Sequence, residues 1–157
     1  MGAEVKYMVN ISGKDAFMAV VGKACYLNCR NVNEFFSAAF EKGCAKMVLN
    51  CKDCAGMDST FLGMVAGAAL KLKKRGGEFV FLNLEGRNLE IVENLGIAKF
   101  ARVLSDSAEA KASGELKAAS AGLSMILGAH ENLIEADASN LAKFEDVVAF
   151  LKKEKGA

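Results

Sequence analysis

Two neighbouring polar residues, Asp58 and Ser59, have the side-chain types and the position best suited to chemistry in this chain. They follow an apolar, strand-like run at residues 46–51 and a short polar loop. After them, apolar residues recur at spacings of three and four, the period of an amphipathic helix: Phe61, Leu62, Val65, Ala68, Ala69 and Leu72. We therefore expect Asp58 and Ser59 at or next to the N-cap of a helix.

A carboxylate and a hydroxyl at a helix start have two interpretations. Asp and Ser are preferred N-cap residues, so the simpler one is capping alone. The other is that Ser59 accepts a phosphate, which adds about −1.5 to −2 charges. A helix N-terminus tolerates an anion, whereas Asp58 repels it by about 1 to 3 kcal/mol. Phosphorylation would then change binding to a partner without unfolding the chain. Thr60 is expected only to cap or pack.

Other chemistry-bearing residues favour different functions less strongly. Cys51 and Cys54 have the C-x-x-C spacing of a redox dithiol or half of a zinc site, with Cys25 and Cys29 as the other half. The predicted helix begins several residues after Cys54, which is too far for its dipole to stabilise a thiolate. We therefore expect the cysteines to be unreactive residues of the core or of loops. The single histidine, His130, lies on an apolar stripe and is expected to be structural. No nucleophile, base and orienting group can be assembled, and we expect neither an enzyme nor a cofactor or metal site.

Composition excludes some classes of partner. The 157 residues carry a net charge of +1 spread along the chain, which argues against nucleic acid and anionic membranes. The longest uncharged apolar stretch, residues 61–70, is about half of the ~20 residues that a membrane span needs. Five cysteines are an odd number, and no secretory leader pattern is visible, so a cytoplasmic, reducing setting is expected.

The periodicity of the whole chain predicts an α/β fold. A hairpin is followed by alternating strands and helices, which favours a mixed, mostly parallel sheet of four to five strands with helices packed against it. The expected strands are residues 5–11, 16–21, 47–51, 78–83 and 101–104, and the expected helices are residues 32–42, 60–75, 87–95 and, opening at Ser105, an alanine-rich helix to about 119. Two further amphipathic stripes, at 123–134 and 141–151, predict a C-terminal helical extension.

In this order of elements the chain resembles the STAS domain family of anti-sigma-factor antagonists. The resemblance covers roughly residues 5–119 and rests on four groups: Asn50 with Asp53, Met57-Asp58-Ser59-Thr60 before Leu62-Gly63, Gly76-Gly77, and Asn94-Leu95-Gly96-Ile97 before Phe100. It implies a STAS domain at residues 1–119 and an extension at 120–157. It also implies that Ser59 is phosphorylated by a partner serine kinase, itself the anti-sigma factor, and reset by a phosphatase.

The resemblance further implies a partner-binding surface around Ser59, formed by Asp53, Gly56, Met57, Asp58, Ser59, Thr60, Phe61 and Gly63. Phe61 departs from the family pattern, in which a small residue is common two places after the phosphoacceptor. Residues 120–157 have no counterpart in the minimal domain, and we expect them to pack on the same chain or to join two copies as a homodimer. The alternatives are a regulatory or ligand-binding STAS module of a transport or sensory complex, with Ser59 unmodified, and a thiol redox or metal protein using Cys51 and Cys54.

Overall fold

One mixed sheet organises the chain, and the computed structural model describes residues 5–105 and 114–156 of it. Within these residues the strand order is β6-β5-β3-β2-β1-β7, and β4 pairs with the far half of β2. β1 pairs antiparallel with β2 and β7, and the other pairings are parallel. The strands are β1 Lys6–Ser12, β2 Asp15–Ala24, β3 Lys46–Asn50, β4 Cys54–Met57, β5 Glu78–Leu82, β6 Arg102–Leu104 and β7 Gly114–Leu116.

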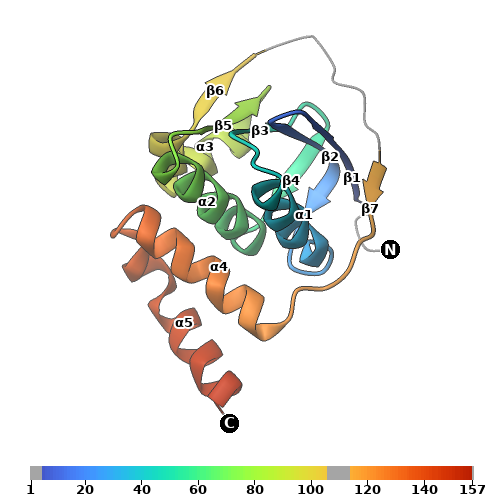
Figure 1. Cartoon of the computed structure of the whole chain (residues 1–157). Helices are drawn as coiled ribbons and strands as arrows, with labels where there is room; N and C mark the ends of the chain where they lie inside the picture. The colour runs from blue at the N-terminus through green and yellow to red at the C-terminus, as the bar shows by residue number, and fades with distance from the viewer. Residues whose placement is uncertain (1–4, 106–113, 157) are drawn as a thin grey trace.

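The helices form two layers beyond the sheet. α1 and α2 lie side by side against the sheet, α4 lies along the outer side of α2, and α5 projects away from the body to the C-terminus (Figure 1). The helices are α1 Arg30–Glu41, α2 Ser59–Lys74, α3 Gly86–Asn94, α4 Leu123–Ala136 and α5 Asn140–Gly156, with a 3₁₀ helix η1 at Ile97–Phe100. None of the helices in the described part is both long enough and apolar enough to cross a bilayer.

The length of β2 explains how the start of α2 is positioned. Residues 15–19 of β2 pair with β3, and from Gly22 onward the strand pairs with β4 instead. The register shifts at Gly22, whose φ of 98° is a conformation that glycine adopts without strain. The backbone N–H of Asp58 donates to the carbonyl of Ala24 at 3.0 Å, which extends the pairing by one residue. Asp58 is therefore held by the sheet just where α2 begins.

α2 is the central helix of the core. The sheet lies on one side of it and α4 on the other, so ten of its sixteen residues are buried. Phe61 is fully buried and its ring stacks on that of Tyr7 from β1, with centroids 6.1 Å apart. Burying a side chain of this size stabilises the fold by about 1.5 to 3 kcal/mol. The N-terminal turn of α2 is thus fixed by the packing of Phe61 on β1 as well as by its cap.

The predicted α/β architecture is confirmed, but the sheet has seven strands in the described residues rather than four to five. β4 was expected to be loop, because four residues of Cys-Ala-Gly-Met show no alternation. β7 falls in the segment predicted as an alanine-rich helix up to about 119, and that prediction is wrong for residues 114–119. Pairing with the edge of β1 satisfies backbone groups there and overrides local helix propensity. Residues 106–113 lie outside the described residues.

Candidate functional site

Asp58 links the start of α2 to a neighbouring loop. Its Oδ1 accepts a hydrogen bond from the backbone N–H of Phe61 at 2.9 Å, which caps the helix. Its Oδ2 accepts from the backbone N–H of Tyr26 at 2.8 Å, in the loop between β2 and α1. Both carboxylate oxygens are therefore engaged, and the carboxylate fixes the loop beside Ser59. Capping by Asp58 agrees with the expectation from sequence, whereas the bond to Tyr26 was not expected.

Ser59, the first residue of α2, is half-buried and bonded to the C-terminal extension. Its Oγ lies 2.9 Å from Nε2 of His130 on α4. Nδ1 of His130 lies 2.7 Å from the carbonyl oxygen of Ile126, which can only accept. In the neutral imidazole the proton is therefore on Nδ1, and the Ser59 hydroxyl donates to Nε2.

His130 is the residue at this site that sequence reasoning missed as a partner of Ser59. Its side chain is 4% exposed and its ring meets that of Phe144 on α5 edge-on, with centroids 5.0 Å apart. The only signal was its place on an apolar helical stripe, and that signal correctly indicated burial. Which helix it would face was not visible, because 71 residues separate it from Ser59.

The arrangement has some features of a nucleophile with its base. A hydroxyl, an imidazole and an orienting carbonyl lie in one hydrogen-bonded row, contrary to the expectation that no such group would assemble. Acyl transfer also needs free N–H donors for an oxyanion. The N–H of Phe61, the natural donor at this helix start, is already bound to the carboxylate of Asp58. The geometry therefore suits a Ser59 hydroxyl that makes a structural hydrogen bond to His130 better than a nucleophile that attacks a substrate.

The structure separates the eight expected partner-binding residues into two groups. Asp53 is exposed, and Gly56, Asp58 and Ser59 are half-buried, so these four retain some surface. The other four are buried and offer no surface to a partner in this conformation: Met57, Thr60, Phe61 and Gly63. The reason is that β4 pairs with β2, Phe61 packs on Tyr7, and α4 covers Gly63.

Two exposed apolar side chains beside the site were not expected. Tyr26 is 47% and Leu27 is 57% exposed in the loop that Asp58 holds. The same loop is bound by the segment that leads into α4, since the N–H of Ala121 donates to the carbonyl of Tyr26 at 2.7 Å. Ser120 Oγ donates to the carbonyl of Leu27 at 3.2 Å. This loop therefore contacts both Asp58 and the beginning of the C-terminal extension.

The cysteines form no assembled site among the described residues. All five are unpaired, and no group of three or more His, Cys, Asp or Glu side chains there is arranged to hold a metal ion. Burial raises the pKa of the Cys51 and Cys54 thiols above the usual value. Burial, followed by the charge of Asp58, raises the pKa of Cys29 to about 12. At Cys29, Cys51 and Cys54 the thiolate is therefore disfavoured at neutral pH, against what redox chemistry requires.

Comparison with known proteins gives one family and one fold. The family model described as the STAS domain matches residues 6–110, more than half of the chain. No curated protein sequence matches the chain. α4, α5 and His130 lie outside the residues that the family model matches.

Solved structures with this fold include three of anti-sigma factor antagonists. SpoIIAA in its unphosphorylated form is 16% identical, with a TM-score of 0.54 over 65% of this chain and 89% of that one. The Bacillus cell fate determinant SpoIIAA in its phosphorylated form is also 16% identical, with a TM-score of 0.56 over 64% and 91%. An anti-sigma factor antagonist from Mycobacterium paratuberculosis is 15% identical, with a TM-score of 0.56 over 64% and 86%. At identities of 15–16%, these similarities show a shared fold and nothing more.

Proposed function

Because this chain belongs to the STAS domain family, we propose that it is a non-enzymatic signalling protein of the anti-sigma-factor-antagonist type. It binds an ATP-dependent serine kinase that is itself the anti-sigma factor, and phosphorylation of Ser59 ends that binding. The observation that carries the proposal is the position of Ser59, which is the first residue of α2, directly after the capping Asp58 and the end of β4. A phosphatase resets the protein.

The chemistry of the switch follows from that position. The γ-phosphoryl group passes from ATP to Ser59 Oγ, ADP leaves, and the hydroxyl proton goes to a base of the kinase. The helix dipole favours the new anion by about 0.3 to 1 kcal/mol. The neighbouring Asp58 carboxylate opposes it by about 1 to 3 kcal/mol. The repulsion exceeds the dipole effect by at most about 2 to 3 kcal/mol, which is less than the stability of a typical domain, so the sheet and α2 persist. A partner shaped around the neutral hydroxyl loses affinity tenfold for each 1.4 kcal/mol.

The partner surface combines expected and newly found residues. Asp53, Gly56, Asp58 and Ser59 contribute the part predicted from sequence that keeps some exposure. Tyr26 and Leu27 extend it, because the loop that carries them is tied to Asp58. Aromatic and apolar anchors next to a polar rim are typical of protein interfaces.

The setting in this proposal is the cytoplasm, where the kinase has ATP and thiols stay reduced. Five unpaired cysteines fit such a compartment.

A second function is favoured by one observation. The Ser59 hydroxyl already has a partner within the chain, His130, at 2.9 Å. That contact fits a regulatory or ligand-binding STAS module of a transport or sensory complex in which Ser59 is never modified. Genes for a kinase and a phosphatase beside the gene for this chain would favour the first function, and transporter subunits would favour the second.

The decisive experiment is mass spectrometry of the protein purified from its own source. Trypsin releases the peptide 53–71, which contains both Ser59 and Thr60, and fragmentation of the peptide backbone assigns the phosphate to one of them. We expect phosphate on Ser59 only. Incubation with the cognate kinase and ATP should reproduce it, Ser59→Ala should abolish it, and Ser37→Ala, which removes an exposed hydroxyl on α1, should leave it unchanged. Labelling that persists in Ser59→Ala would contradict the assignment.

A further inference from the structure

The face of α2 that carries Ser59 is shaped to receive a helix, and α4 occupies it. A methyl group built on Gly63 would overlap the backbone of Ala129, and one built on Gly67 would overlap the side chain of Asn132. Asn132 Nδ2 donates to the carbonyl of Gly63 at 3.1 Å. The two glycines, one helical turn apart, therefore let α4 approach the backbone of α2 closely.

At the N-terminal end of this face, the contact between the helices is the hydrogen bond from Ser59 to His130. The 2.9 Å between Oγ and Nε2 is the span of one hydrogen bond and leaves no room for a phosphorus atom and its oxygens. If Ser59 turned away to make room, Nε2 of His130, which is 4% exposed, would lose its partner. Asp58 adds a like charge beside the phosphate. Docking of α4 on α2 therefore requires that Ser59 is not phosphorylated.

We propose that α4 is a displaceable intramolecular ligand of the α2 face, which docks over Ser59 when the hydroxyl is free and leaves when Ser59 is phosphorylated. The use of this movement in signalling rests on the proposed phosphorylation of Ser59. The kinase reaches Ser59 only in molecules from which α4 has moved, so α4 competes with the partner. The apparent affinity for the kinase is the intrinsic affinity multiplied by the fraction of molecules with α4 displaced.

The segment just before α4 limits how far the displaced helices travel. Residues 119–121 are bound to the loop at 26–30 through backbone hydrogen bonds, including Arg30 N–H to the carbonyl of Ala119 at 2.9 Å. Gly122 follows, exposed and with no heavy atom within 4 Å of a built Cβ. Gly122 is therefore the point about which α4 and α5 swing, and the swing also breaks the contacts of Lys99 with Asp137 and of Asn140 with the carbonyl of Leu95 at the far end of α4.

The first experiment installs phosphoserine at position 59 of the full chain during translation, without any kinase, and follows amide hydrogen exchange. We expect the amides of residues 123–136 to exchange at least about tenfold faster, with β1, β3 and β5 unchanged. Phosphoserine at position 12, an exposed residue at the end of β1, is the control for added charge and should have no such effect. Unchanged or slower exchange of α4, as when His130 binds the phosphate as a cation, would overturn the proposal.

The second experiment displaces α4 without phosphate. Gly63→Ala places a methyl group against Ala129 and should speed exchange of residues 123–136. Gly128→Ala, a matched change on α4 where a Cβ meets no atom within 4 Å, should not. With the cognate kinase, Gly63→Ala should also be phosphorylated faster than the unaltered chain. If exchange in α4 is the same for both variants, the proposal is wrong. If exchange behaves as expected but the kinase never modifies Ser59, the proposed function fails while the displacement of α4 stands.

Discussion

At the residue scale, Asp58 makes two hydrogen bonds whose contribution to the free energy of unfolding can be measured. Its carboxylate caps α2 through Phe61 and holds the loop through Tyr26. Asp58→Ala removes both hydrogen bonds, and we expect the free energy of unfolding to fall by about 1 to 2 kcal/mol. Urea unfolding followed by circular dichroism measures it. Asp53→Ala, the same change at an exposed side chain, should cost less than about 0.5 kcal/mol. Equal losses in the two variants would show that the Asp58 bonds contribute nothing.

Phe61 is a large apolar residue two places after Ser59, and its role here is packing. The ring is fully buried and stacked on Tyr7. Phe61→Ala should lower the free energy of unfolding by about 3 to 5 kcal/mol, because it leaves a cavity under the first turn of α2. Thermal and urea unfolding test this. Leu27→Ala, at an apolar side chain that is 57% exposed and lies outside the C-terminal helices, is the control and should change little. A small effect at Phe61 would mean that the core refills the space.

The site shows which residue contacts a sequence reveals and which it hides. The cap from Asp58 to Phe61 spans three residues and follows from helix geometry, so the pattern around Ser59 predicts it. The bond from Asp58 to Tyr26 spans 32 residues and the contact of Ser59 with His130 spans 71. Such contacts depend on how elements pack, which no local period encodes. The sequence therefore predicts the helix start and its chemistry but not what covers it.

At the element scale, the long and strongly periodic segments and the three-residue strand β6 were predicted, whereas the short strands β4 and β7 were not. α2 was expected at residues 60–75 and lies at Ser59–Lys74, because its apolar positions repeat over four turns. β4 and β7 have four and three residues, too few for a period of two to be seen. Their pairing partners, β2 and β1, lie far away in the sequence and supply the edges that make them strands.

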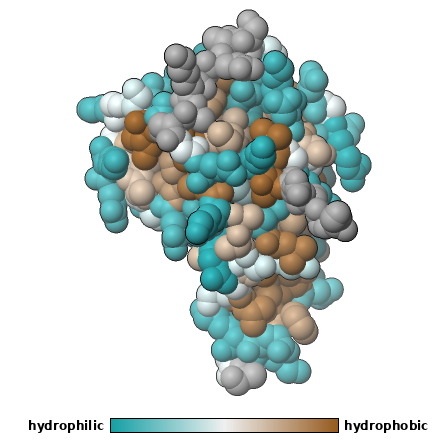
Figure 2. Space-filling model, turned by 90° about the vertical axis from the view of Figure 1, so that its right-hand side faces the viewer, coloured by the Kyte–Doolittle hydropathy of each residue, from teal (hydrophilic) through white to brown (hydrophobic). Residues whose placement is uncertain are grey.

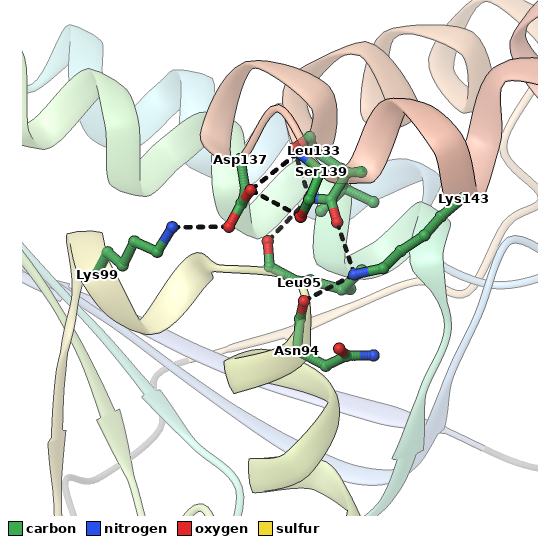
Figure 3. Close-up of polar contacts among 8 residues, drawn as sticks. Asn94, Leu95, Lys99, Leu133, Asp137, Ser139 and Lys143 are labelled. Carbon is green, nitrogen blue, oxygen red and sulfur yellow. Dashed lines mark hydrogen bonds and ion pairs between the residues drawn. The ribbon is translucent and has the colours of Figure 1, made fainter.

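A cluster of polar contacts holds the corner between α4 and α5 against η1 (Figure 3). The Asp137 carboxylate accepts hydrogen bonds from Lys99 Nζ at 2.7 Å and from Ser139 N–H and Oγ at 3.0 and 2.8 Å. The Lys99 ammonium, followed by Ser139, holds the pKa of Asp137 well below its usual range. A carboxyl group whose pKa is lowered by folding stabilises the fold above its unfolded pKa of about 3.9, and this stabilisation is lost as the pH falls below that value.

Asp137→Asn should therefore destabilise the protein at about pH 6, and the difference from the unaltered chain should shrink as the pH falls to about 3. Urea unfolding across this range measures it, and added salt should weaken the effect because the Lys99 side chain is exposed. Glu131→Gln, at an exposed residue of α4, is the control and should change stability by less than about 0.5 kcal/mol. A difference between Asp137→Asn and the unaltered chain that grows as the pH falls would contradict the prediction.

At the scale of the whole molecule, the projecting C-terminal helices carry an apolar surface (Figure 2). Leu123, Val147 and Phe150 are 46%, 40% and 59% exposed there. Apolar side chains gathered on a projecting element are typical of an interface, and two copies joined through the same patch give a closed, twofold dimer. We therefore keep the prediction of a homodimer through the C-terminal helices.

Light scattering coupled to size-exclusion chromatography, over a range of protein concentrations, tests the homodimer. The unaltered chain should approach the mass of two chains as its concentration rises, because burial of the apolar surface drives association. Phe150→Glu should keep the mass of one chain, since it places a charge in the interface. Leu27→Glu, at an equally exposed apolar residue outside these helices, should still dimerise. If all three proteins keep the mass of a single chain at every concentration, no dimer forms through the C-terminal helices and the prediction is wrong.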